Sequence, residues 1–175
     1  MTTAIATPHP ARNTDQSPLP LSRPEITAVD SEKSTTYYMI QTLSQNYSFL
    51  LPDKNVGFLA STEDMESVDT IPCLVFNDQY YPIYSFSSGL TPSLGLASGD
   101  NKALLIETTN GLRLGLSCRT IYKVRSHKPV RSLPGFMCQH SPFKAVLKYK
   151  ESWLYLTSAD AIFEYLESQQ TRSPK

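Results

Sequence analysis

The chain has 175 residues, of which 40% are hydrophobic, so it can form one packed domain or two small lobes that share a core. Sixteen basic and sixteen acidic residues cancel, and the net charge therefore predicts no general attraction to nucleic acid or to an anionic membrane. Charged residues make up only 18% of the chain, whereas Ser, Thr and Tyr are plentiful, a mixture typical of short strands with polar outer faces.

The sequence predicts a cytoplasmic protein. It has no run of eighteen apolar residues that could span a membrane, and its first ten residues lack the charged start and apolar stretch of a signal peptide. Cys73, Cys118 and Cys138 are odd in number and lie on or near apolar runs. Without an export signal, we expect buried free thiols rather than a disulfide or a metal site.

Residues 1–34 differ in composition from the rest of the chain. They contain five prolines and no aromatic residue. Such a segment cannot bury enough apolar surface to offset the entropy lost on ordering, so a disordered tail rich in Pro, Thr and Ser is predicted. The folded domain is expected over residues 35–175.

The first ordered elements form a hairpin. Residues 37–40 and 47–51 are short runs rich in aromatic and aliphatic side chains, separated by turn-forming residues and ended by Pro52. The following stretch, residues 53–69, is polar and acidic. We interpret it as an irregular connection.

The strongest hairpin pattern of the first half joins residues 73–76 to residues 79–84. Asn77 and Asp78 form its turn, because both tolerate the conformations that tight turns require. Pro82 has no N–H to donate, so the return strand is expected at an edge of its sheet or at a bulge. A loop through residues 87–100 follows.

The second half continues with short strands. Residues 103–106 and 112–116 are predicted to pair across Asn110-Gly111 in a type I′ turn. Residues 120–124 alternate as a further strand.

The chain ends in a hairpin and a helix. Residues 143–149 and 153–156 form the hairpin. Thr157 is expected to cap the helix, with Asp160 completing a capping box. The apolar side chains of one helix face are Ala159, Ile162, Phe163 and Leu166. The fold class is therefore mainly β with one C-terminal helix.

No pattern of catalytic or ligand-binding residues emerges. Cys138 and His140 match no structural zinc spacing, and their closeness in sequence does not aim a base at a thiol. The loop glycines lack the Lys-Ser/Thr ending of a phosphate-binding loop. Paired acids such as Glu63 and Asp64 lie in the polar connection. The sequence predicts neither an enzyme nor a bound cofactor or metal.

Two surface patterns leave alternatives open. The first is a basic cluster of Lys123, Arg125, His127, Lys128 and Arg131. It fits a solvated face, an acidic protein partner, or a nucleic-acid-binding β-barrel. The second pattern is Tyr80, Tyr81 and Tyr84 on the central hairpin, which either point outward as a protein interface or fill a second face of the sheet.

The order of elements from residue 37 to residue 166 resembles the CheW-like domains, adaptors that couple chemoreceptors to a histidine kinase in bacteria. The resemblance rests on the Leu-Pro step near Pro52, the central hairpin with Pro82, the Gly-Leu step at Gly115-Leu116, and Leu133-Pro134-Gly135. The final helix also fits.

The resemblance implies a fold of two small SH3-like five-stranded β-barrels with a C-terminal helix, without catalysis. It implies docking to the regulatory domain of a CheA-like histidine kinase and to the cytoplasmic tip of a chemoreceptor, but no nucleic acid and no insertion into a membrane. Chemosensory systems that control pili and twitching motility also use such adaptors.

The chain departs from the family pattern where partners are recognised. Asn77 stands in place of an Arg, Asp78 in place of a Gly, and Arg119 in place of an Asp. A changed charge rejects one partner as readily as it selects another, so another regulatory protein is an alternative partner. The predicted partner-binding residues are Asn77, Asp78, Gln79, Tyr80 and Arg119.

Overall fold

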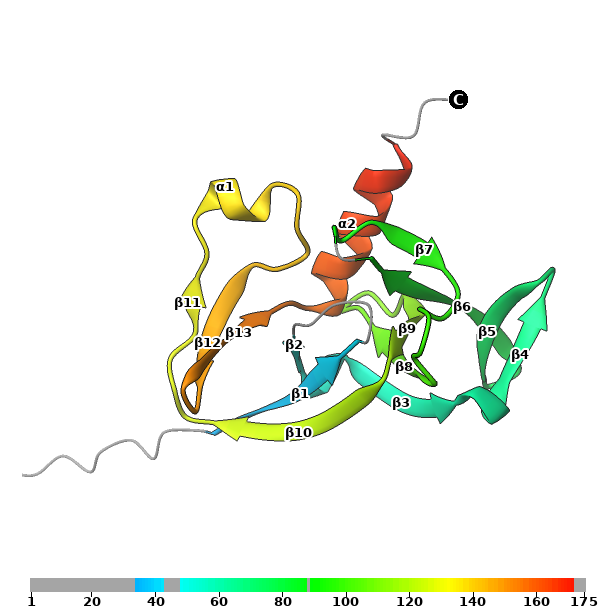
Figure 1. Ribbon diagram of the computed structural model, residues 1–175, viewed down its shortest axis with the longest axis horizontal. Helices are drawn as coiled ribbons and strands as arrows, with labels where there is room; N and C mark the ends of the chain where they lie inside the picture. The colour runs from blue at the N-terminus through cyan, green and yellow to red at the C-terminus, as the bar shows by residue number, and fades with distance from the viewer. Residues whose placement is uncertain (1–33, 43–47, 88, 172–175) are drawn as a thin grey trace, which may run out of the picture. The chain divides into compact units, whose positions relative to one another are not determined.

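The structure is a computed structural model, and it describes residues 34–42, 48–87 and 89–171. Apart from Ser34, the predicted tail lies outside the described residues. The described residues form one compact unit, whose elements fall into two sheets (Figure 1).

The first sheet, here called lobe 1, has six strands in the order β10-β1-β2-β13-β12-β11. Its neighbours pair antiparallel except β2 and β13, which are parallel. The strands of lobe 1 are β1 (Thr35–Gln41), β2 (Ser48–Pro52), β10 (Thr120–Ser126), β11 (Arg131–Ser132), β12 (Ala145–Tyr149) and β13 (Ser152–Leu156).

The second sheet, lobe 2, has seven strands in the order β3-β8-β9-β6-β5-β4, with β7 paired to β6. Its strands are β3 (Val56–Ser61), β4 (Met65–Val68), β5 (Ile71–Phe76), β6 (Gln79–Phe86), β7 (Pro92–Leu94), β8 (Lys102–Glu107) and β9 (Arg113–Cys118). The helical segments of the chain are η1 (Asp53–Asn55), η2 (Thr62–Asp64), α1 (Gly135–Cys138) and α2 (Ala159–Gln170).

Central strands are buried on both faces, and this joins the two lobes. In β8, Leu104 and Ile106 enter one apolar cluster while Ala103 and Leu105 enter another, because side chains alternate along a strand. In β2, Leu50 packs with Leu147 in the core of lobe 1. Each lobe therefore has a small core of its own.

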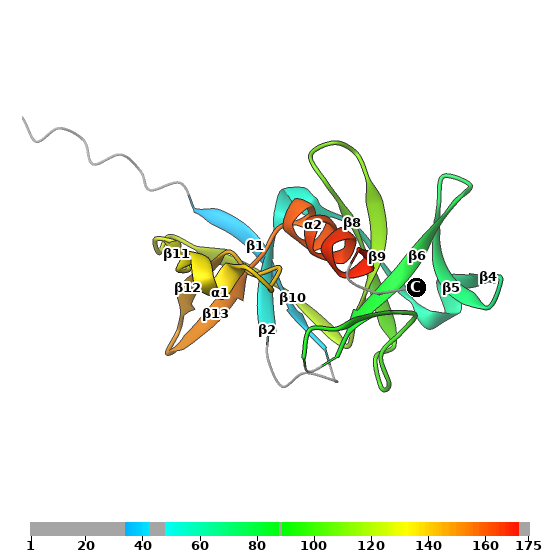
Figure 2. The same cartoon turned by 90° about the horizontal axis from the view of Figure 1, so that it is seen from above.

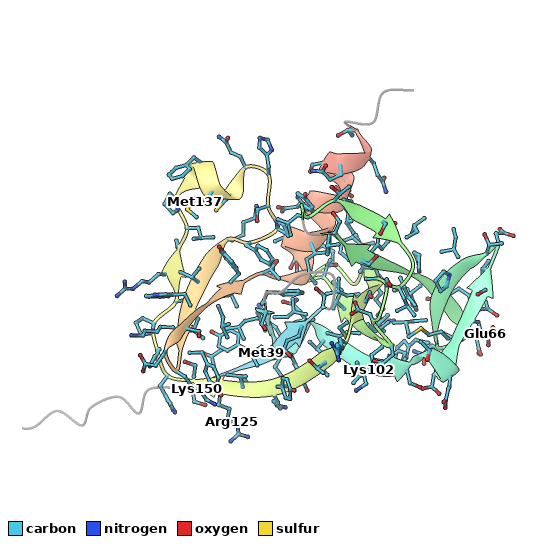
Figure 3. All side chains as sticks on the ribbon, in the orientation of Figure 1. Met39, Glu66, Lys102, Arg125, Met137 and Lys150 are labelled. Atoms are coloured by element: carbon cyan, nitrogen blue, oxygen red, sulfur yellow. The ribbon has the colours of Figure 1, made fainter. Side chains whose placement is uncertain are left out.

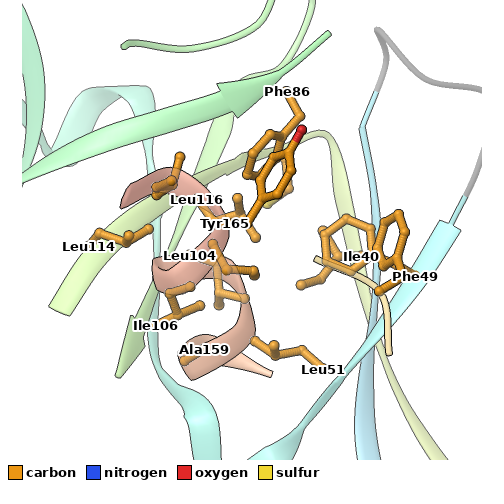
Figure 4. Close-up of a cluster of buried hydrophobic side chains, with 14 residues drawn as sticks. Ile40, Phe49, Leu51, Phe86, Leu104, Ile106, Leu114, Leu116, Ala159 and Tyr165 are labelled. Atoms are coloured by element: carbon orange, nitrogen blue, oxygen red, sulfur yellow. The ribbon is translucent and has the colours of Figure 1, made fainter. Parts of the chain in front are cut away.

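The cluster that contains Leu104 and Ile106 is the largest of the three and is shared between the lobes. Side chains of α2 such as Ile162 and Tyr165 pack in it against Ile40 of β1 and Leu104 of β8 (Figure 4). The helix lies between the lobes in both views (Figures 1 and 2). The predictions of a mainly β fold, of two small SH3-like barrels and of a C-terminal helix are confirmed, but the two sheets have six and seven strands instead of the five predicted for each barrel.

The hairpins predicted from the sequence are present, but the connection at residues 53–69 was interpreted wrongly. It contains two strands, β3 paired with β8 and β4 paired with β5. The expected loop at 87–100 also contains the short strand β7. These strands are short and half-exposed, and Glu66 of β4, the one acidic residue among them, is exposed.

The β8–β9 hairpin exists, but its turn is not type I′. Only Gly111 of the Asn110-Gly111 pair has a positive φ, of 80°. The loop is five residues long, closed by a bond from Thr108 N to Leu112 O at 2.9 Å. Thr108 Oγ1 also accepts from Leu112 N at 2.9 Å, and this side-chain bond stabilises the wider loop.

Pro82 does not lie in an edge strand, which was one of the two alternatives predicted for the return strand. It is the last residue of β6 paired with β5, and the next residues pair with β9 and β7. The residue without an N–H therefore lies where the pairing of β6 changes from β5 to β9 and β7.

The cap of α2 lies one residue later than predicted. Ser158 Oγ accepts from Ala161 N at 3.2 Å, whereas Thr157 is buried and donates to Pro142 O at 2.7 Å. Asp160 accepts from Thr109 N and Oγ1, and these bonds lower the pKa of its carboxyl. Within the described residues, no helix is long and apolar enough to cross a membrane.

Candidate functional site

The central turn joins β5 to β6 through two residues, Asn77 and Asp78. Both have left-handed backbones, with φ of 51° and 59°, and Phe76 pairs with Gln79 on either side. A two-residue loop with both φ values positive is a type I′ turn, whose twist matches that of the flanking strands. Asn and Asp adopt this conformation more readily than other residues with a side chain. The turn is therefore short and conformationally defined.

The substitution Asp78→Gly is expected to raise the free energy of unfolding by about 0.5 kcal/mol, because glycine adopts a positive φ without steric cost. Urea denaturation followed by circular dichroism measures the change. Asp78→Val is the opposite control: a β-branched side chain at this φ should lower stability by roughly 1–2 kcal/mol. A less stable Asp78→Gly variant would contradict the assigned turn.

The residues after the turn are held by a network. Tyr81 Oη donates to Gln79 Oε1 at 2.6 Å, and Arg113 approaches the same hydroxyl at 3.5 Å. Arg113 also pairs with Glu107 at 2.7 Å, which raises the pKa of the guanidinium, and it lies over the Phe76 ring at 5.2 Å. The Gln79 side-chain oxygen thus has a hydrogen-bond partner within the domain.

Tyr80 is the outward-facing tyrosine of the three left undecided by the sequence. It is 52% exposed, whereas Tyr81 and Tyr84 are half-buried against the apolar clusters. The Glu66 carboxylate on β4 accepts a hydrogen bond from Tyr80 and raises the pKa of its hydroxyl. An exposed aromatic ring beside a rigid turn is suited to insertion into a partner.

Arg119 lies away from this turn. It is exposed between β9 and β10, and its backbone N donates to Gln41 O at 2.8 Å. Strands β6 and β9 are parallel, with Ile83 opposite Gly115. Asn77 precedes that pair and Arg119 follows it, so the two residues lie toward opposite ends of the strands. Four of the five predicted residues therefore lie together at the β5–β6 turn, and Arg119 lies away from them.

The three cysteines lie on different elements, β5, β9 and α1. Cys73 and Cys118 are buried and Cys138 is half-buried, and all three are free thiols. Burial raises the pKa of Cys118 to about 12, which suppresses its reactive thiolate. Cys138 Sγ lies 3.8 Å from Leu133 O. Among the described residues, no group of three or more His, Cys, Asp or Glu side chains could hold a metal ion.

The basic cluster is divided between two strands. Lys123 on β10 pairs with Asp53 at 3.2 Å and lies over the Tyr38 ring, and the carboxylate raises the pKa of its ammonium. Arg131 on β11 instead lies 5.1 Å from the centre of the Trp153 ring. Lys123 and Arg131 are thus engaged by different side chains.

Sequence reasoning based on net charge missed a strong segregation of charge. Residues 55–101, mostly lobe 2, contain six acidic residues and no Lys, Arg or His. Residues 108–150, mostly lobe 1, contain nine Lys and Arg and no acidic residue. Figure 3 shows Glu66 in lobe 2, and Arg125 and Lys150 in lobe 1. A count by segment would have revealed this pattern before the structure.

Comparison with known proteins identifies the fold. No family model and no curated protein matches the sequence. Fifteen chains of solved structures do match, among them the scaffolding protein TtCheW from Thermoanaerobacter tengcongensis. That structure is 12% identical, covers 70% of this chain and 87% of its own length, and gives a TM-score of 0.50.

The likeness defines the class of fold. Two curled sheets with a helix between them, aligned over most of TtCheW, make this a CheW-like domain in structure. At 12% identity the likeness shows the fold alone, and it agrees with the family that the order of sequence elements resembles.

Proposed function

We propose that the protein is a non-catalytic adaptor of a bacterial chemosensory signalling system. The observation that supports this proposal is the CheW-like fold, shared with a protein described as a scaffolding protein. The exposed, ordered turn between β5 and β6 supports a binding role. A rigid loop with a projecting aromatic residue loses little entropy on docking.

The proposed partners are the regulatory domain of a CheA-like histidine kinase and the cytoplasmic tip of a chemoreceptor. We assign the contact to Asn77, Asp78, Gln79 and Tyr80, with Arg119 as a separate contact toward the opposite end of strands β6 and β9. A pathway that controls pili and twitching motility is one setting for such an adaptor.

The chemistry of the turn favours a partner with basic or hydrogen-bond-donating groups. Asp78 and the nearby Glu66 are negative, and the segment around them has no basic residue. An arginine at position 77, as in the CheW-like family, would repel a basic partner. The presence of Asn77 there therefore changes which partner surface can bind the turn.

The test is isothermal calorimetry of the full chain with the regulatory domain of a histidine kinase from the same organism. We expect micromolar affinity, and Tyr80→Ala is expected to weaken it by about tenfold, the effect of a single interface aromatic. The matched control is Tyr122→Ala on β10, because Tyr122 is 50% exposed and Tyr80 is 52% exposed.

If Tyr80→Ala and Tyr122→Ala weaken the affinity equally, the turn is not the specific contact with the kinase domain. Absence of binding to every kinase regulatory domain and receptor tip of the organism would overturn the adaptor proposal while leaving the fold unchanged. Binding to a different regulatory protein through Tyr80 would support the alternative partner identified from the sequence.

A further inference from the structure

The outer face of β11, β12 and β13 carries basic and aromatic side chains in register. Arg131 pairs with Val146, Val146 with Tyr155, and Lys148 with Trp153. Directly paired residues point to the same side of a sheet, as do residues two apart along a strand. All five side chains therefore share one face, here called the basic–aromatic face.

This face is exposed although its rings are large. Trp153 is 49% exposed and Tyr155 is 37% exposed, while Leu147 on the opposite side of β12 is fully buried. Exposed Trp and Tyr with a neighbouring Arg are the residue types that dominate binding energy at protein interfaces.

The side chains of the face are held in place by one another and by the core. The Arg131 guanidinium lies over the Trp153 ring, with 5.1 Å to the ring centre. The Tyr155 ring stacks on the buried Phe143 ring, with 5.0 Å between the ring centres. A partner would thus meet a surface that is already ordered, which lowers the entropy lost on binding.

The charge of the face is uniform. Arg131 and Lys148 belong to the stretch of residues 108–150 that has no acidic residue, and Glu151 at the tip of the β12–β13 hairpin is the one acid between residues 108 and 159. A surface with one sign of charge and exposed rings selects an oppositely charged partner.

We propose that the basic–aromatic face docks an acidic protein segment that also carries apolar side chains. The carboxylates would pair with Arg131 and Lys148, and the apolar side chains would cover Trp153 and Tyr155. This contact lies in lobe 1, on a different lobe from the β5–β6 turn, so it does not depend on the adaptor role.

Two features favour a protein over single-stranded nucleic acid at this face. Arg131 already occupies one side of the Trp153 ring, which leaves less of it for a stacking base. The helix α1, which follows β11 in the chain, carries Phe136 and Met137, exposed by 76% and 44%. Exposed apolar side chains of this kind contribute to protein contacts but cannot bind phosphate.

The test uses the single tryptophan of the chain, Trp153, as a reporter within the face. A capped synthetic peptide of alternating glutamate and leucine, which does not itself fluoresce, is titrated into the full-length protein while tryptophan emission is followed. We expect saturable quenching or a spectral shift, weaker binding of polyglutamate, and about a tenfold loss of affinity in Arg131→Glu/Lys148→Glu.

The matched control is Lys123→Glu/Arg125→Glu on β10, which changes the net charge equally but lies outside the face. Circular dichroism confirms that both double variants are folded, and the control should retain affinity within about threefold. Equal losses in the two double variants would show a general charge effect and overturn the assigned face, as would no response to the peptide.

Tighter binding of oligothymidylate than of the peptide would assign the face to nucleic acid instead. Sedimentation showing a dimer that Arg131→Glu/Lys148→Glu abolishes would make a second copy the occupant, and would also overturn the proposal of a separate partner.

Discussion

Gly115→Ala is expected to lower the free energy of unfolding by about 2–3 kcal/mol, because β9 has no space for a side chain at this position. A Cβ atom there would lie 2.8 Å from Ile83 Cγ1, 3.1 Å from Leu74 Cδ1 and 3.2 Å from Ile83 Cα. The last of these is a backbone atom, which cannot move aside without shifting β6. Ile83 is the residue directly paired with Gly115, so strain would fall on the β6–β9 contact itself.

The measurement is urea denaturation of the variant beside the unmodified chain. Gly135→Ala provides the matched control, since a Cβ atom at Gly135 would meet nothing within 4 Å and its φ is not positive. Its stability should change by less than about 0.5 kcal/mol. A Gly115→Ala variant as stable as the Gly135→Ala variant would show that β6 and β9 are not in contact as described.

The elements that the sequence predicted correctly are those with a regular hydrophobic pattern and distinct turn residues. The hairpin around Asn77 and Asp78 has both features, and β10 has the regular hydrophobic pattern. The strand β3 has neither, because the exposed Leu59 interrupts its alternation and Gly57 lowers its strand propensity. The strand β4 is four residues long and points Glu66 outward, so local composition indicated a loop.

Tertiary contacts explain the remaining errors of the sequence interpretation. Thr157 is a good capping residue, but its hydroxyl is used by Pro142 O in the neighbouring loop, and Ser158 caps α2 instead. Tyr165 was not among the expected core residues. It is nevertheless buried, with only 8% of its surface exposed. Its hydroxyl donates a hydrogen bond to Leu90 O at 3.1 Å, and its ring packs near Phe86. Neither partner is near in sequence.

The candidate site was predictable only in part for the same reason. Asn77 to Tyr80 are contiguous, so their common location follows from the hairpin alone. The separation of Arg119 from them depends on the parallel pairing of β6 and β9, which residue patterns do not specify. The basic–aromatic face depends on the register of three strands, and Arg131 and Trp153 are 22 residues apart in the sequence.

The shared core makes a second prediction, which concerns the coupling of the lobes. Leu104→Ala is expected to lower the free energy of unfolding by about 2–5 kcal/mol, the cost of a cavity at a fully buried leucine. Leu104 is 1% exposed and lies in lobe 2, yet its cluster includes Ile40 and Phe49 of lobe 1 and Ile162 of α2. Loss of its side chain therefore removes contacts on both sides of the interface between the sheets.

Trp153 reports this coupling, because it lies in lobe 1 and is the only tryptophan of the chain. If the lobes unfold as one unit, Leu104→Ala in lobe 2 shifts the tryptophan transition to lower urea by the full change in stability. Leu112→Ala is the matched control, since Leu112 is 53% exposed and its truncation should cost less than about 0.5 kcal/mol. An unshifted Trp153 transition in Leu104→Ala, together with a shifted far-ultraviolet transition, would mean that the lobes unfold independently. The shared cluster argues against that outcome, because neither lobe alone can cover the apolar side of α2.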